Sequence, residues 1–143
     1  MAYTKNVIIT RNNLANNTYG ICLSESLNNC ISENHITANY LYGIELSSSN
    51  NNSISENNIT NNGRYAFELY GYGIGLRSSN NNMISGNNLA NNAYGMYLSW
   101  SLSNCISGNN ITNNKHQGIT FIDSSNNTIL GNNITYNWRG ISL

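Results

Sequence analysis

The sequence predicts an all-β solenoid in which about six coils of 22–23 residues stack on one another. Three observations predict this fold. The first two are that a repeat runs through the whole chain and that apolar residues recur at the same places of every repeat. The third observation is composition, because 33 of the 143 residues are Asn and none is Pro. Asn suits bends, and a chain without Pro keeps its backbone N–H groups available for strand pairing.

Each repeat begins in an Asn-rich segment and ends in a Gly-hydrophobic-x-hydrophobic element, such as Gly20–Leu23 or Gly140–Leu143. The repeats start at Asn6, Asn28, Asn51, Asn81, Ser103 and Asn126. The spacings between these starts are 22, 23, 30, 22 and 23 residues. The third repeat therefore carries an insertion of eight residues, Gly63–Tyr70.

Aligning the repeats gives four wholly apolar columns, in which most side chains are β-branched and suit strands. The columns are Ile9/Ile31/Ile54/Ile84/Ile106/Ile129, Leu14/Ile36/Ile59/Leu89/Ile111/Ile134, Ile21/Ile44/Ile74/Met96/Ile119/Ile141 and Leu23/Leu46/Leu76/Leu98/Phe121/Leu143. No single coil can bury its own apolar side chains, so the coils must stack. We expect three short strands per coil, with all 24 of these side chains inside.

Two further columns contain only Asn, and they are Asn12/Asn34/Asn57/Asn87/Asn109/Asn132 and Asn17/Asn39/Asn62/Asn92/Asn114/Asn137. Asn tolerates left-handed backbone angles, so we expect these residues to form the corners of the coils. Stacked at the spacing of neighbouring strands, about 4.8 Å, their amides can also bond to one another along each column.

The pattern resembles the right-handed parallel β-helix repeat family, which includes NosD-like, carbohydrate-binding and sugar-hydrolase β-helices. The resemblance rests on the run Asn-Asn-x-Ile-Ser-x-Asn-x-Ile-Thr-x-Asn, as in Asn51–Asn62, followed by Tyr-Gly-Ile-x-Leu, as in Tyr94–Leu98. It implies a single-stranded right-handed parallel β-helix, with residues 1–143 forming one domain or a fragment of a longer solenoid. A leucine-rich repeat is the competing fold, but the intervals between columns contain few helix formers.

The charges exclude some classes of function, because six Lys and Arg balance six Asp and Glu. Nucleic-acid binding needs a basic face, and a membrane-spanning helix needs about 20 apolar residues, so we expect neither. The three cysteines are odd in number, and Cys30 and Cys105 share a column three coils apart, too far for a disulfide. We expect reduced thiols.

A metal site is a weak alternative. Met83 and Cys105 are neighbours in one column, and both are soft ligands that suit copper. The NosD-like resemblance implies a copper-accessory role, so the pair is a candidate. No His shares that column, and His35 and His116 lie far apart in the stack. We therefore expect no metal and no cofactor.

Catalysis has one candidate pair, Glu33 and Glu56, which occupy one column on adjacent coils after Arg11. Two carboxylates about 5 Å apart would suit a retaining glycosidase. The alternative is an exposed ladder in which Arg11 offsets part of their repulsion. The other acids are scattered, and none of the acidic or histidine-containing runs of pectin hydrolases is present. We therefore predict a chain that is not an enzyme, with a glycosidase or lyase as the alternative.

Aromatic residues give the candidate binding surface, because aromatic rings are platforms for sugars and for protein anchors. Some lie in the insertion, which should project from the rod, and others form a column just before each Gly-Ile. These candidates are Arg64, Tyr65, Phe67 and Tyr70, and the column Tyr19, Tyr42, Tyr72 and Tyr94. The alternative is that the insertion shields a sheet flank while the Tyr column stacks on itself.

The predicted function is a scaffold or recognition module that binds a polysaccharide or a cell-surface partner. The resemblance implies an extracellular or cell-surface location, although Met1–Lys5 shows no signal peptide. Ice binding through Thr37, Thr60, Thr112 and Thr135 is a remote third hypothesis for the function. Because a solenoid leaves an unpaired rung at each end, we also expect self-association through the terminal coils.

Overall fold

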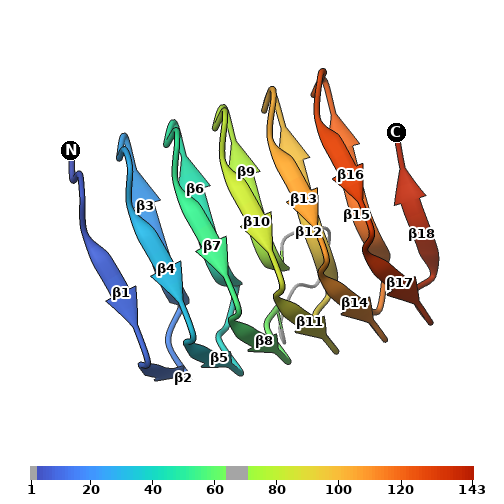
Figure 1. Cartoon of the computed structure of the whole chain (residues 1–143). Helices are drawn as coiled ribbons and strands as arrows, with labels where there is room; N and C mark the ends of the chain where they lie inside the picture. The colour runs from blue at the N-terminus through green and yellow to red at the C-terminus, as the bar shows by residue number, and fades with distance from the viewer. Residues whose placement is uncertain (1–2, 64–70) are drawn as a thin grey trace.

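The computed structural model describes residues 3–63 and 71–143, which wind into six coils whose strands form three parallel sheets (Figure 1). The described residues contain no helix, so none there could span a membrane. The predicted all-β parallel solenoid is confirmed, and helix-containing leucine-rich repeats do not fit the described residues.

The three sheets take one strand each from every coil. The first sheet contains β1 (Ile8–Thr10), β4 (Cys30–Ser32), β7 (Ser53–Ser55), β10 (Met83–Ser85), β13 (Cys105–Ser107) and β16 (Thr128–Leu130). The second contains β2 (Asn13–Ala15), β5 (His35–Thr37), β8 (Asn58–Thr60), β11 (Asn88–Ala90), β14 (Asn110–Thr112) and β17 (Asn133–Thr135). The third contains β3 (Tyr19–Ser24), β6 (Tyr42–Ser47), β9 (Tyr72–Arg77), β12 (Tyr94–Ser99), β15 (Gln117–Ile122) and β18 (Arg139–Ser142). Equivalent residues stack in register, as Ile31 does on Ile54.

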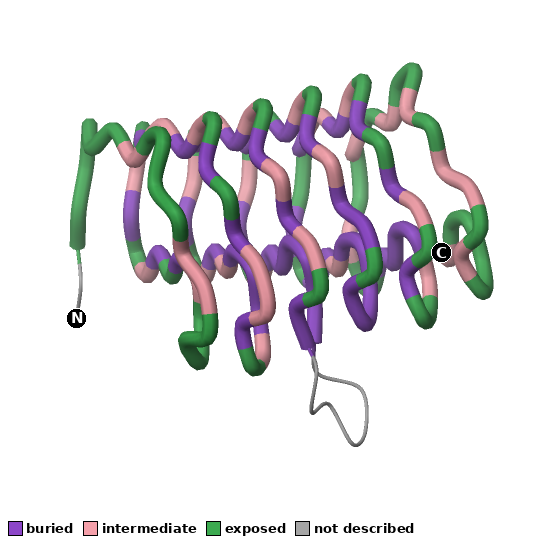
Figure 2. Tube along the Cα trace, turned by 90° about the horizontal axis from the view of Figure 1, so that it is seen from below, coloured by how far each residue is buried: buried purple, intermediate pink, exposed green. Residues whose placement is uncertain are grey.

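The predicted apolar columns form the interior, although burial is lost at the ends. Eighteen of the 24 side chains are buried, and Ile9, Leu14, Ile129 and Ile134 are partly buried against them. The prediction was wrong at the end of the chain, where Ile141 in β18 and Leu143 just after it are 45% and 96% exposed. These end positions have a neighbouring coil on one side only, as the exposed terminal coils in Figure 2 show.

The two predicted Asn columns are buried ladders whose amides replace strand pairing at the bends. Asn57 is typical: its Nδ2 donates to Asn87 Oδ1 at 2.9 Å and to Ile31 O at 2.9 Å. The same Asn87 oxygen accepts from Asn57 N at 3.0 Å. Each amide thus pairs backbone groups that would otherwise be buried without partners, which is costly.

Two more ladders line the bends after the third sheet, and the sequence analysis missed them. They are Ser26/Ser49/Ser79/Ser101/Ser124 and Asn29/Asn52/Asn82/Asn104/Asn127. A Ser-x-x-Asn spacing recurs in five repeats and could have identified them.

The left-handed backbone angles lie one residue before the ladders, which corrects the expectation that the ladder Asn residues themselves adopt them. Glu33 has a φ of 55° and precedes Asn34, while Gly86 has a φ of 65° and precedes Asn87. The left-handed residue turns the chain, and the next side chain then points inward.

The insertion leaves and rejoins the rod at one point. A Cβ on Gly63, whose φ is +80°, would lie 2.8 Å from the Cα of Gly71. Gly63 N donates to Asn39 O at 3.1 Å, and Tyr94 N donates to Gly71 O at 2.9 Å, so the coil keeps its register on both sides. The candidates Arg64, Tyr65, Phe67 and Tyr70 lie outside the described residues.

Candidate functional site

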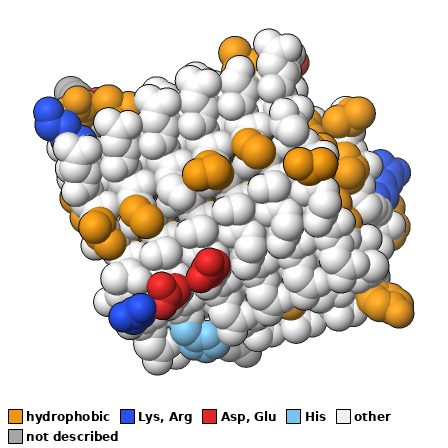
Figure 3. Space-filling model, in the orientation of Figure 1, with side chains coloured by type: hydrophobic (Ala, Val, Ile, Leu, Met, Phe, Trp, Pro, Cys, Tyr) orange, Lys and Arg blue, Asp and Glu red, His pale blue; other side chains and the backbone are white. Residues whose placement is uncertain are grey.

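The predicted acid pair lies on an exposed bend between the first and second sheets. Glu33 and Glu56 occupy the same bend position on adjacent coils, and Arg11 precedes them. Arg11 Nε donates to Glu33 Oε2 at 2.8 Å, and this contact raises the pKa of Arg11. The two side chains are 76% and 43% exposed. On the face in Figure 3, acidic and basic side chains meet in this way near the N-terminal end.

The predicted sulfur pair is also on the surface. Met83 and Cys105 are register neighbours on β10 and β13, and Met83 is 52% exposed. His35 lies on the second sheet, where its Nδ1 is 3.0 Å from Asn58 Nδ2. Across residues 3–63 and 71–143, no group of three His, Cys, Asp or Glu could hold a metal ion. Cys22, Cys30 and Cys105 are free thiols.

The predicted Tyr column comes together on the outer face of the third sheet. Ring centroids are 5.2 Å apart for Tyr19 and Tyr42, 5.2 Å for Tyr42 and Tyr72, and 5.5 Å for Tyr72 and Tyr94. Tyr97, which sequence analysis did not select, stacks on Tyr72 at 4.6 Å. Tyr19 is 39% exposed, whereas Tyr42, Tyr72 and Tyr94 are buried, at 6%, 2% and 7% exposure. Here we call this side of the third sheet the aromatic face. Burial raises the pKa of Tyr72 and Tyr94, so both phenols stay neutral.

An ion pair borders the aromatic face. Arg77 Nε lies 3.4 Å from Glu45 Oε1, and Arg77 Nη2 donates to Tyr42 OH at 3.0 Å. The Glu45 side chain is only 14% exposed, and burial raises its pKa although Arg77 opposes the shift. Sequence analysis treated Glu45 as one of the scattered acids. Aligned repeats place Glu45 opposite Gly75 and Arg77 opposite Ser47, so the ion pair is diagonal and alignment alone does not identify it.

A cavity of about 300 Å³ opens in the aromatic face. Its walls include the rings of Tyr72, Tyr94 and Tyr97 and the polar side chains of Gln117 and Thr120. Gln117 continues the Tyr column into the fifth coil, and Thr120 is the register neighbour of Tyr97. The cavity therefore lies between two outward columns of the third sheet and combines ring surfaces with hydrogen-bonding groups.

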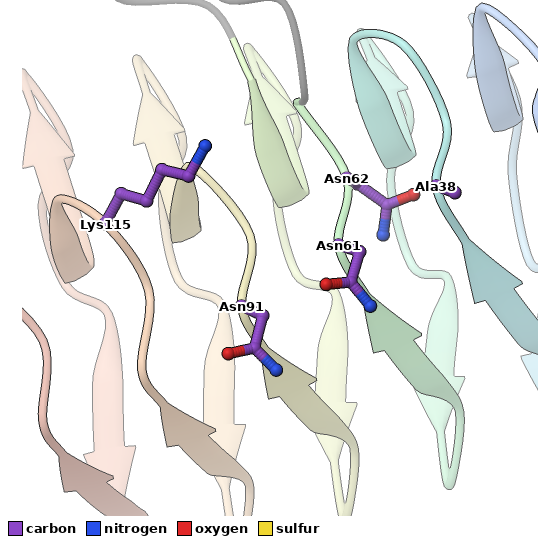
Figure 4. A pocket seen from close by; sticks show the side chains of 5 residues that line it. All are labelled: Ala38, Asn61, Asn62, Asn91 and Lys115. Atoms are coloured by element: carbon purple, nitrogen blue, oxygen red, sulfur yellow. The ribbon is translucent and has the colours of Figure 1, made fainter.

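A second cavity shares two lining residues with this one, and a third cavity shares one residue with the second. One, of about 520 Å³, is lined by Tyr94, Lys115, His116, Gln117 and Trp138. The other, of about 290 Å³, is lined by Ala38, Asn61, Asn62, Asn91 and Lys115, and Figure 4 shows these residues on successive bends. Tyr94 and Gln117 join the first two cavities, and Lys115 joins the last two. None of the described lining residues is acidic.

The outer face of the second sheet is different, and we call it the amide face. Its column begins at His35 and continues through Asn58, Asn88, Asn110 and Asn133, with contacts of 2.8–3.0 Å between neighbours. Beside it, Thr37 pairs with Thr60 and Thr112 with Thr135, at 3.1 and 3.3 Å. The four threonine hydroxyls on which the ice-binding hypothesis depends thus bond to each other in two separate pairs.

Solved structures similar to this chain include enzymes that act on polysaccharides. A double mutant of the periplasmic alginate epimerase AlgG matches with a TM-score of 0.69 and 24% identity, over 83% of this chain and 30% of the epimerase. The epimerase AlgG itself matches with a TM-score of 0.70 and 18% identity, over 98% and 42%. The enzymatically active domain of tailspike protein 2 from bacteriophage CBA120 gives 0.67 and 16%, over 91% and 23%.

The chain therefore spans less than half the length of these proteins, and at such identities the likeness shows a shared fold. The prediction that the chain is not an enzyme is contradicted, because these neighbours are an epimerase and an enzymatically active domain. That prediction rested on the scarcity of acids, whereas a single suitably placed carboxyl is enough for proton transfer.

Sequence comparison agrees with the fold of the chain. No curated protein matches the chain in sequence. The family described as the right-handed β-helix region matches residues 1–143, the whole chain. The stacked coils, the parallel sheets and this match together show that the chain belongs to the right-handed β-helix family.

Proposed function

We propose that this chain is a carbohydrate-active β-helix unit that holds a polysaccharide along its aromatic face. One observation carries the proposal: two cavities that share Tyr94 and Gln117 lie along this face, lined by aromatic rings and by polar side chains, and a third cavity on the neighbouring bends shares Lys115 with one of them. Sugars present apolar ring faces and hydroxyl groups together, so they need both kinds of wall. A row of linked cavities suits a polymer better than a single small molecule.

The charges along the cavities favour an acidic polysaccharide. Lys115 lines the larger cavity, and the guanidinium of Arg139 lies 4.5 Å from the centre of the Trp138 ring, which also lines it. Cations near a carboxylate bind it by charge-assisted hydrogen bonds. Alginate, on which the AlgG epimerase acts, is an acidic polysaccharide and is therefore the first substrate to test. Such a partner fits an extracellular or periplasmic setting.

Glu45 is the proposed proton-transfer residue, with Arg77 and Tyr42 as its neighbours. A carboxyl with a raised pKa holds its proton closer to neutral pH, which suits transfer to a glycosidic oxygen or exchange at a sugar carbon. Arg77 can pair with an acidic sugar as well as with Glu45. The exposed Glu33 and Glu56 lack this enclosure.

The test combines binding and product analysis. Alginate and a panel of neutral and acidic polysaccharides are titrated calorimetrically, and incubated samples are examined by NMR for cleavage or epimerisation. We expect binding of an acidic polysaccharide, and product that disappears in Glu45→Gln but persists in the matched control Glu56→Gln. Absence of binding to every polysaccharide would overturn the proposal. Equal product from both variants would remove Glu45 from the chemistry.

A further inference from the structure

Two polar atoms in the 300 Å³ cavity are buried without hydrogen-bond partners. Thr120 is 7% exposed, and its Oγ1 has no partner within the described structure. Gln117 Oε1 is also buried and has no hydrogen-bond partner within the described structure. Both side chains line the cavity between Tyr94 and Tyr97. Buried polar atoms are nearly always paired in proteins, so two unpaired atoms on residues that line one cavity need an explanation.

The neighbouring positions show that these atoms are not a general property of the repeat. Gln117 follows Tyr94 in its column, and Thr120 follows Tyr97. The third coil has a ring at the first of these columns only, Tyr72, with Gly75 at the second. The fourth coil has rings at both, and its Tyr97 stacks on Tyr72. In the fifth coil Gln117 and Thr120 occupy these two columns, and the rings of Tyr94 and Tyr97 line the cavity. The ring of His116, also in the fifth coil, stacks on Tyr94 with the centroids 4.7 Å apart.

We infer that this cavity is a subsite for one sugar ring, and that Gln117 and Thr120 select a ring by its free hydroxyl groups. The inference rests on the proposed polysaccharide function and deepens it. The apolar face of the sugar lies against the Tyr walls, one hydroxyl donates to Gln117 Oε1, and Thr120 Oγ1 bonds to a second.

The chemistry of the two atoms specifies hydroxyl groups. A carboxamide oxygen only accepts hydrogen bonds, so its partner must be a donor, and an ionised carboxylate has no proton to donate. Carboxylates of an acidic polysaccharide are accommodated near Lys115 in the adjoining cavity. The two cavities thus divide the recognition of one chain: charge in the larger and hydroxyl pattern in the smaller.

The test uses the full chain, with alginate oligosaccharides as the probe. Thr120→Val keeps the branched shape but removes the unpaired hydroxyl, so we expect an unchanged or higher Tm without ligand and an affinity that falls about tenfold. Gln117→Leu should act in the same direction. The matched control is Thr112→Val on the amide face, whose hydroxyl pairs with Thr135; its affinity should not change.

A chemical variant of the probe sharpens the result. O-acetylation of the alginate oligosaccharides removes hydroxyl donors, so it should weaken binding to the wild-type chain and have little further effect on Gln117→Leu. If the wild type binds and both variants bind equally well, the subsite is wrong while the proposed function stands. If the wild type binds none of the polysaccharides, the proposed function fails. A lower Tm for Thr120→Val would show that the hydroxyl has a structural partner, and would overturn the inference.

Discussion

The amide face and the aromatic face are built by the same coils, but their outward side chains are arranged in opposite ways. On the amide face, nearly identical side chains recur and bond to one another from His35 to Asn133. On the aromatic face, rings stack in the early coils, but cavities and unpaired atoms appear in the later ones. A repeated polar residue uses its hydrogen-bonding groups on its neighbours in the column. Few of these groups then remain free to bind a ligand.

The difference shows where a solenoid can acquire a function. One outward column of the third sheet reads Cys22, Glu45, Gly75, Tyr97, Thr120 and Ser142, with no two residues alike. The proposed proton-transfer residue and both a ring wall and a hydroxyl of the proposed subsite come from this column. Specific chemistry therefore lies where the repeat is interrupted, and the regular columns support it.

The largest expected effect concerns the strands under the aromatic face. Gly95→Ala would place a Cβ in severe contact with the backbone oxygen of Gly118 and 2.6 Å from Ile111 Cγ2, and backbone cannot move aside easily. We expect a loss of about 3 kcal/mol or more in unfolding free energy, measured by urea denaturation. In the matched control Gly140→Ala, the nearest atom is 3.9 Å away, so stability should hardly change. Equal losses would contradict the close-approach argument.

The second effect separates the faces by binding. Tyr97→Ala removes a ring that both stacks on Tyr72 and lines the 300 Å³ cavity. Affinity for alginate oligosaccharides should fall by about 1–2 kcal/mol, roughly five- to thirty-fold in calorimetry. Tyr97→Phe keeps the ring and should retain most of the affinity. A Tyr97→Ala chain that binds like the wild type would place the ligand elsewhere.

The third effect tests the amide face. Asn88 donates to Asn58 at 2.8 Å and accepts from Asn110 at 2.9 Å, so Asn88→Ala interrupts the outer ladder. Partial exposure lets water replace these bonds, so we expect a loss of only about 1 kcal/mol, seen as a lower Tm. Polysaccharide affinity should be unaffected. Weaker binding in this variant would mean that the amide face also contacts the ligand.

The smallest expected effect is a pH dependence at Glu45. Burial raises its pKa above the ordinary value of 4.5, so the folded chain holds this proton more tightly than the unfolded chain. The resulting stabilisation is present below pH 4.5 and is lost as pH rises through the folded pKa. The stability of Glu45→Gln relative to the wild type should therefore increase from pH 4 to pH 7 in thermal unfolding. A constant difference would show that Arg77 cancels the shift, and Glu56→Gln serves as the exposed control.

The interior of the fold could be predicted from the sequence because burial in a solenoid is a property of columns. Ile31, Ile54 and Ile84 are equivalent in the repeat and equally buried. Alignment could not tell that Ile141 and Leu143 are exposed, because it identifies the inward direction and not the presence of a covering coil. It also placed the left-handed angle on the ladder Asn, although the turn belongs to the residue before it.

The candidate site was harder to predict, because it depends on residues that differ between coils. The Tyr column could be identified since it repeats, whereas Gln117 and Thr120 occur once and resemble ordinary surface residues. The number of acidic residues also gave no reason to select Glu45, because its pairing with Arg77 depends on side-chain contacts across adjacent strands. Recurrence identifies the framework, and single departures from it identify the chemistry.

The close approach of Gly63 and Gly71 has a consequence for how such proteins change over generations. Because Gly63 and Gly71 lie close together, and Asn62 N donates to Asn92 Oδ1, the length of chain between the two glycines can change while the register of the coils is kept. The entropy of closing a loop rises only slowly with its length, so longer or shorter segments cost little. Evolution and protein engineers can both use this position as a graft point, where a new peptide is displayed on an unchanged rod.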